Sequence, residues 1–123
     1  MNHILIVEDE EFLVRTLQDN LNSEGFKTDA AMDGEEAVSK LEKIKPDLIL
    51  LDLLLPKKDG FYVLSHVKKN PDLKNIPVIV LYNLGGDAEI KRALEMGADD
   101  YLVKSQHPIQ EVVEKVTSFL TKT

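Results

Sequence analysis

Short apolar runs alternate along the chain with longer segments of helical periodicity, and this alternation restricts the fold more than any other feature. The run Leu48–Leu51 is apolar at every position, which is typical of a parallel strand covered on both faces. Further apolar runs predict strands at Ile4–Val7, Val78–Tyr82 and Tyr101–Val103, and a weaker pattern predicts one at Lys27–Ala31.

A helix is predicted after each of these strands from apolar residues spaced three and four apart. The first helix spans Glu10–Ser23, with Phe12 and Leu17 on its apolar face, and Gly25 is placed to stop it. The second opens at Asp33-Gly34, carries an apolar stripe that continues to Ile44, and is ended by Pro46. The other three are marked by Phe61, Leu64 and Val67, by Ile90, Ala93 and Leu94, and by a stripe from Ile109 to Leu120. Five such strand–helix pairs predict a doubly wound α/β fold, with a five-stranded parallel sheet covered by helices on both faces.

Length and composition place this fold in one domain over residues 1–123 and exclude several functions. The chain has no cysteine, which excludes disulfides and thiolate metal sites and fits a cytoplasmic location. No apolar run approaches the length of a membrane span. The net charge of -7 argues against direct nucleic-acid binding and is compatible with a protein partner or a bound cation.

Ligands of open parallel sheets bind beyond the carboxyl ends of the strands, so the residues just past each strand are considered together. Glu8 and Asp9 follow the first strand, and Asp52 ends the third. Tyr82 ends the fourth, and Lys104 follows the fifth. We therefore expect three carboxylates and one ammonium group to converge on one rim of the sheet.

Three clustered carboxylates repel one another unless a cation compensates them, and Mg²⁺ takes carboxylates together with waters and phosphate oxygens. Lys104 can stand opposite as a point charge for an anionic oxygen. Metal and lysine around Asp52 would form a workable phosphoryl-transfer site, in which the aspartate is the nucleophile and becomes an acyl phosphate. Asp52 could also be a strand-end residue that caps a loop, but a carboxylate among buried leucines is costly without a purpose.

Three segments carry a resemblance to a known family: Glu8-Asp9 after the run Ile4–Val7, the segment Leu50–Gly60 around Asp52, and the segment Gly97–Lys104. In this order and at these strand ends they resemble a response regulator receiver domain of the CheY-like type in two-component signalling, and the resemblance covers essentially the whole chain. It implies a flavodoxin-like strand order 2-1-3-4-5.

The resemblance also implies a role for each site residue. Asp52 would accept a phosphoryl group from a histidine kinase or phosphotransfer protein, and Lys104 would contact that group. Mg²⁺, or Mn²⁺, would be bound by Glu8, Asp9, Asp52 and the backbone carbonyl of Leu54. Tyr82 and Tyr101 would take part in the switch, since Tyr101 stands where the rotamer of an aromatic residue reports it. The chain would assist its own phosphorylation and dephosphorylation without a separate substrate. It would act on an unknown downstream protein as a monomer or weak dimer.

Two positions depart from the family pattern. Tyr82 stands where the family usually has Thr or Ser, whose hydroxyl binds the phosphoryl group. Its ring must either point outward over residues 83–86 or turn into the space that Tyr101 would use, unless Asn83 or a backbone amide supplies the missing donor. Ser105 follows Lys104, where the family often has a proline after a cis peptide bond. A cis bond before a non-proline residue would cost about 3–4 kcal/mol, and the geometry of this bond is left open.

Three functions remain to be compared. The first is a phosphorylatable signalling switch, and the second is a protein-interaction module of the same fold whose switch is uncoupled or lost because of Tyr82. The third, a metal-dependent phosphatase or a flavodoxin-like cofactor protein, fits poorly. The phosphatase would need an acid at Leu54, and the cofactor protein would need a hydroxyl-rich loop where Glu8 and Asp9 stand.

Overall fold

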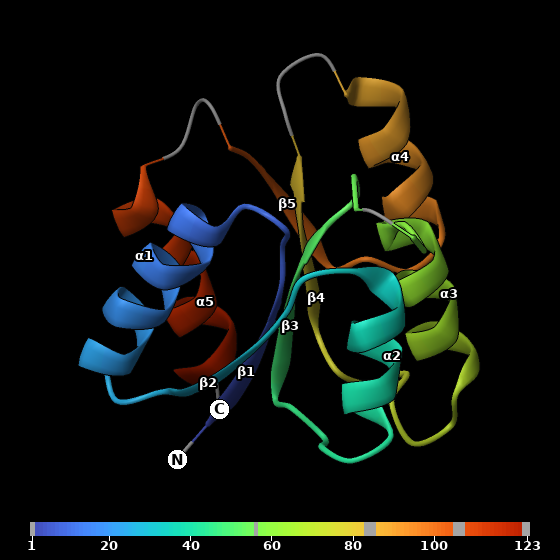
Figure 1. The fold of residues 1–123 in the computed structure, drawn as a ribbon. Helices are drawn as coiled ribbons and strands as arrows, with labels where there is room; N and C mark the ends of the chain where they lie inside the picture. The colour runs from blue at the N-terminus through green and yellow to red at the C-terminus, as the bar shows by residue number, and fades with distance from the viewer. Residues whose placement is uncertain (1, 56, 83–85, 105–107, 122–123) are drawn as a thin grey trace.

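Five parallel strands form one sheet in the order β2-β1-β3-β4-β5, as shown by a computed structural model of the chain (Figure 1). The structure describes residues 2–55, 57–82, 86–104 and 108–121. The elements in chain order are β1 His3–Val7, α1 Glu11–Ser23, β2 Lys27–Ala31, α2 Gly34–Leu41, β3 Leu48–Asp52, α3 Gly60–Lys69, β4 Val78–Tyr82, α4 Asp87–Glu95, β5 Asp100–Val103 and α5 Ile109–Thr121. The predicted α/β fold and its strand order are confirmed.

The helices cover the two faces of the sheet separately (Figure 1). Helices α1 and α5 lie on one face, and α2, α3 and α4 lie on the other. Each face has its own buried core, because alternate strand residues point to opposite sides. Ile4, Ile6 and Leu50 belong to the core under α1 and α5, whereas Leu5 and Leu51 belong to the core under α2, α3 and α4. The apolar run Leu48–Leu51 of β3 is buried as predicted, and Asp52 at the end of the strand is buried as well.

Two details of the sequence-based prediction are wrong. Phe12 is predicted on the buried face of α1 but is 78% exposed, whereas the predicted Leu17 is buried, together with Val14 and Leu21. Helix α2 ends at Leu41 rather than continuing to Ile44. Ile44 still packs against the core from a turn, and Pro46 keeps the preceding residue out of the helical conformation.

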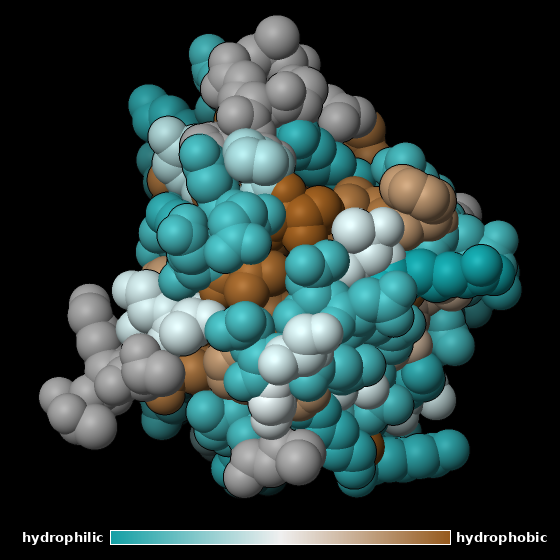
Figure 2. All heavy atoms as spheres, turned by 90° about the vertical axis from the view of Figure 1, so that its left-hand side faces the viewer, coloured by the Kyte–Doolittle hydropathy of each residue, from teal (hydrophilic) through white to brown (hydrophobic). Residues whose placement is uncertain are grey.

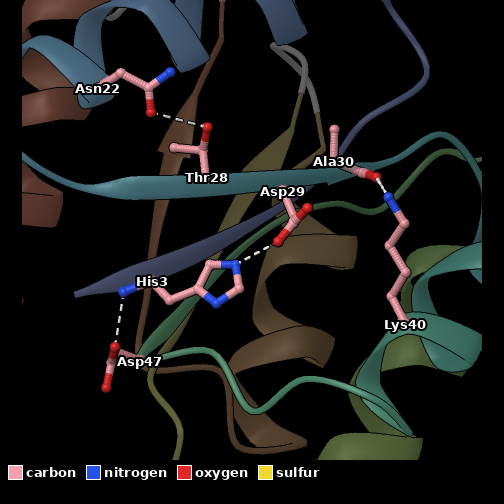
Figure 3. A network of polar contacts seen from close by, with 7 residues as sticks. All are labelled: His3, Asn22, Thr28, Asp29, Ala30, Lys40 and Asp47. Atoms are coloured by element: carbon pink, nitrogen blue, oxygen red, sulfur yellow. Dashed lines mark hydrogen bonds and ion pairs between the residues drawn. The ribbon is translucent and has the colours of Figure 1, made fainter. Parts of the chain in front are cut away.

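Polar contacts connect the edge strand β2 with β1 and with helices α1 and α2, and they connect the start of β1 with Asp47 (Figure 3). The His3 imidazole Nε2 lies 2.5 Å from Asp29 Oδ2, and the His3 backbone N–H donates to Asp47 Oδ2 at 2.7 Å. Two more hydrogen bonds tie β2 to helices on opposite faces, from Thr28 to the Asn22 side chain in α1 and from the Lys40 ammonium in α2 to the Ala30 carbonyl. The His3 contacts lie at the amino-terminal end of β1, away from the carboxyl ends of the strands, and give His3 a structural role.

Candidate functional site

Three carboxylates meet at the carboxyl ends of β1 and β3. Glu8 and Asp9 follow β1 directly, and Asp52 is the last residue of β3. Because Val7 pairs with Leu51 in these neighbouring parallel strands, the residues that follow them emerge side by side. One carboxylate oxygen from each of Glu8, Asp9 and Asp52 lies within 4.8 Å of the others. The convergence predicted from the strand ends is therefore present.

The ammonium group of Lys104 stands between the two buried acids. Its Nζ lies 2.6 Å from Glu8 Oε1 and 3.0 Å from Asp52 Oδ2. Lys104 follows β5, and its backbone N–H donates to the Tyr82 carbonyl at 2.7 Å, which extends the pairing of β4 with β5 by one residue. Only 16% of its side chain is exposed, so its charge acts in a poorly hydrated environment.

The acids differ sharply in burial. Glu8 is fully buried, Asp52 is 4% exposed, and Asp9 is exposed. Burial raises the pKa of Glu8 to about 7 although Lys104 opposes the shift, and the Asp52 charge adds to the rise. The pKa of Lys104 is also raised, because its contacts with Glu8 and Asp52 outweigh its own burial. At neutral pH the pocket thus holds more negative charge than one ammonium group balances.

The residues present fit a hard divalent cation. Glu8 Oε2 accepts a hydrogen bond from the Glu10 backbone N–H at 3.1 Å, and Glu8 Oε1 forms the ion pair with Lys104. Buried Glu8 and Asp52, together with the exposed Asp9, offer converging carboxylate oxygens, which are the donors that Mg²⁺ and Mn²⁺ prefer. The structure thus brings together three of the four predicted metal ligands.

The loop between β3 and α3 supplies the fourth predicted ligand, the carbonyl of Leu54. The Leu54 backbone N–H donates to Asp52 Oδ1 at 3.1 Å, so this loop touches the Asp52 carboxylate. The Leu54 side chain is 57% exposed. Metal binding by its carbonyl stays a prediction.

Tyr82 lies in the core on the α4 side of the sheet, with 9% of its surface exposed. A Cβ at Gly86, just before α4, would lie 1.7 Å from the Tyr82 ring, so the ring packs directly against that glycine. Burial, together with Glu89 and Asp52, raises the pKa of Tyr82 and keeps its hydroxyl neutral. Tyr101 is 42% exposed on β5. Asn83 and Ser105, which concern the two departures from the family pattern, lie outside the described residues.

Two features of the site's surroundings had not been predicted. One is a groove of about 400 Å³ between the N-terminal parts of α1 and α5, lined by Phe12, Leu13, Ile109 and, at its edge, Lys104. Figure 2 shows the face that contains it, with hydrophobic side chains at the centre and hydrophilic ones around them. The other is the contact of the β3–α3 loop with the start of α2 at Gly34. In the sequence, the only sign that Phe12 is exposed is that the apolar stripe of α1 is wider than one buried face. Nothing in the sequence predicts the contact between the β3–α3 loop and Gly34.

Comparison with known proteins identifies the family. The model of the response regulator receiver domain matches residues 4–117, and the chain belongs to this family of two-component signalling domains. The chain is 40% identical to the alkaline phosphatase synthesis transcriptional regulatory protein PhoP of Bacillus subtilis strain 168, over 98% of this chain and 49% of that protein. It spans about half the length of the curated relatives that it matches first.

Solved structures agree with this assignment. The phosphorylated cyanobacterial phytochrome response regulator RcpA has a TM-score of 0.88 and 32% identity, with 99% of this chain and 96% of that chain covered. The Mn²⁺-bound form of response regulator Rcp1 has a TM-score of 0.88 and 35% identity, with 100% of this chain and 96% of that chain covered. The resemblance seen in the sequence is therefore confirmed.

The raised pKa of Glu8 predicts how stability depends on pH in the metal-free protein. Between the ordinary value of 4.5 and about 7, the folded chain keeps a proton on Glu8 that the unfolded chain releases. The contribution of Glu8 to the free energy of unfolding is therefore full at low pH and is lost as pH rises through this window. Glu8→Gln, which cannot ionise, should gain stability relative to the parent by roughly 1–3 kcal/mol from about pH 5 to about pH 8. Denaturant unfolding in EDTA measures this gain.

Glu10→Gln is the matched control, since Glu10 is exposed and lies outside the site. Its stability relative to the parent should change little over the same pH range. A Glu8→Gln difference that is constant or falls with pH would show that burial does not hold a proton on Glu8.

Proposed function

We propose that this domain is a phosphoacceptor switch in which Asp52 receives a phosphoryl group from a histidine kinase or phosphotransfer protein. The observation that carries the proposal is the placement of Asp52, buried at the end of β3 with the Lys104 ammonium at 3.0 Å and two further acids beside it. An aspartate that only caps a loop at a strand end would need neither the Lys104 ammonium group nor the carboxylates of Glu8 and Asp9 beside it.

The transfer would proceed by attack of a carboxylate oxygen of Asp52 on the phosphorus of a phosphohistidine. A new P–O bond forms as the P–N bond breaks, and the bond's electron pair leaves with the donor imidazole, which then takes a proton. Lys104 would hold a phosphoryl oxygen, and it already contacts the acceptor carboxylate. Bound Mg²⁺ would neutralise charge on the transferred group, held by Glu8, Asp9, Asp52 and the Leu54 carbonyl. On this proposal the domain assists only its own phosphorylation and dephosphorylation and has no separate substrate.

The phosphodonor protein would approach over the apolar groove between α1 and α5. Lys104 borders both this groove and the acid pocket, so a partner seated in the groove would lie next to the acceptor. Phe12, with 78% of its surface exposed, would contribute apolar area that such a partner covers.

The output would reach a downstream protein rather than nucleic acid contacted directly. Several relatives are named as transcriptional regulators, but those names describe proteins about twice as long as this chain. The net charge of -7 of the present chain disfavours contact with phosphate backbones. Among the described residues no helix is long and apolar enough to cross a membrane. The cytoplasmic location and the monomeric or weakly dimeric state stay predictions.

A specific observation supports the alternative of an interaction module with an uncoupled switch. Tyr82 places a buried ring against Gly86, where the family usually has a short hydroxyl side chain. A ring fixed under the start of α4 cannot carry an oxygen to the phosphoryl group as Thr or Ser would. Phosphorylation of Asp52 would then change the α4–β5–α5 face only weakly.

The acceptor assignment predicts that Asp52→Asn takes up no phosphoryl group, because an amide is a poor nucleophile. The parent and the variant are incubated with Mg²⁺ and acetyl phosphate, and intact mass is measured. The parent should gain the mass of one phosphoryl group, and EDTA should prevent the gain. Asp72→Asn, an exposed aspartate after α3, is the matched control and should behave as the parent. Normal phosphorylation of Asp52→Asn would refute the assignment.

The position of Tyr82 predicts that Tyr82→Thr strengthens the coupling between Asp52 and the α4–β5–α5 face. A hydrogen bond to a charged group contributes about 1.5–3 kcal/mol, which shifts a two-state ratio tenfold or more. Adding beryllofluoride, which mimics the phosphoryl group, should change amide shifts at Tyr101 and in α4 little in the parent and strongly in Tyr82→Thr. Tyr62→Thr, on the half-exposed face of α3, is the matched control. Large changes already present in the parent would refute the uncoupled reading.

A further inference from the structure

The loop between β3 and α3 rests on the first residues of α2, far from it in the sequence. A Cβ at Gly34 would lie 2.0 Å from the carbonyl oxygen of Lys58 and 2.6 Å from its carbonyl carbon. Both atoms belong to the backbone and cannot turn aside, so only glycine permits this approach. The loop and the start of α2 are therefore in direct backbone contact.

Asp33, the residue before Gly34, binds both the helix and the loop. Its Oδ1 accepts the Glu36 backbone N–H at 2.8 Å and so caps α2. Its Oδ2 lies 3.6 Å from Lys57 Nζ in the loop. One carboxylate thus connects the helix terminus with the loop.

Lys57 has a backbone conformation that requires such support. Its φ is 62°, and it is the only residue other than glycine with a positive φ among the described parts of the chain. This left-handed conformation is unfavourable for a side chain such as lysine and persists where surrounding contacts impose it. The side chain of Lys57 forms the ion pair with Asp33, and the next residue, Lys58, makes the backbone contact with Gly34.

The same loop carries the groups that surround the acceptor. Leu54 donates its backbone N–H to Asp52 Oδ1 at 3.1 Å, and Gly60 donates its own to the Leu53 carbonyl at 3.0 Å. A Cβ at Gly60 would lie 2.4 Å from the Asp52 carbonyl oxygen, so the far end of the loop is also closed against β3. The Leu54 end of the loop is therefore held to Asp52, and the Gly60 end is held to Leu53 and Asp52.

We propose that Asp33 and Gly34 are positioning residues for the metal site, which act by holding the β3–α3 loop so that the Leu54 carbonyl stays in register with the three acids. The inference rests on the proposed function, since it takes the Leu54 carbonyl as a metal ligand. Neither residue touches the acids, and both act only through the loop. Groups that orient metal ligands in this way commonly change metal affinity about 10–100-fold when they are altered.

The test measures Mg²⁺ affinity by titration followed through amide chemical shifts, including that of Leu54, together with thermal unfolding without metal. Gly34→Ala must push the loop away, and its Mg²⁺ affinity should fall about tenfold or more. Asp33→Asn keeps an oxygen to cap α2 but loses the ion pair with Lys57, and its affinity should fall about two- to fivefold. Lys57→Gln removes the same ion pair from the other side and should weaken binding to a similar degree.

The last two variants separate positioning from simple charge. If Asp33 and Lys57 acted only through their fields, removing the anion would weaken Mg²⁺ binding and removing the cation would strengthen it. The loop contact predicts weaker binding in both. Tighter binding by Lys57→Gln would overturn the inference, even if Gly34→Ala failed to fold. Equal affinity of a folded Gly34→Ala and the parent would do the same.

Two controls complete the comparison. Gly25→Ala alters another glycine, with φ of 94° and no atom within 4 Å of a new Cβ, so it should lower thermal stability and leave Mg²⁺ affinity unchanged. A drop in its affinity like that of Gly34→Ala would show a general effect of stability and overturn the inference. Asp9→Asn removes a proposed ligand directly. If it binds Mg²⁺ as the parent does, the proposed site fails and the inference with it. If it weakens binding and the loop variants do not, only the inference fails.

Discussion

Two carboxylates buried at the end of a parallel sheet must be balanced by positive charge, and the rest of the site depends on how that balance is met. Lys104 meets part of it, with its ammonium group within 3.0 Å of both Glu8 and Asp52. Burial raises the pKa of Glu8, and the negative charge that Lys104 does not balance adds to this rise by favouring protonation of this residue. A divalent cation would relieve the same excess, and a phosphoryl group on Asp52 would change it again. The protonation of Glu8 would therefore depend on any charged group that binds in the pocket.

The fold places this charge where a signal can pass outward. The acids lie at the ends of β1 and β3. Each of these two strands pairs with a neighbouring strand on both sides. The segments beyond the strand ends contact the site, since the β3–α3 loop touches Asp52 and the Tyr82 ring lies against Gly86 at the start of α4. Binding shifts a conformational equilibrium only where two arrangements are available, so a switch in this domain would have to act through these segments.

The site could be predicted well from the sequence because it depends on local patterns and one topological rule. Asp52 and Lys104 lie at strand ends, and parallel strands bring those ends to one rim. The misses depend on contacts between distant segments. The periodicity of α1 could not show that Phe12 lies at the edge of the buried stripe. Asp33-Gly34 had the pattern of a helix start, which it is, but nothing in that pattern reveals the carbonyl of Lys58 against it. The sequence shows that Tyr82 departs from the family's usual Thr or Ser, but the burial of its ring is seen only in the structure.

The most direct measurement of the central claim is the chemical identity of the modified residue. The domain is phosphorylated with Mg²⁺ and acetyl phosphate, treated with borohydride, which reduces an aspartyl phosphate to homoserine, and then digested for peptide mass analysis. The account predicts conversion of aspartate to homoserine at position 52 alone, and none when EDTA replaces Mg²⁺. Conversion at Asp9 or another acid, with Asp52 unchanged, would contradict it.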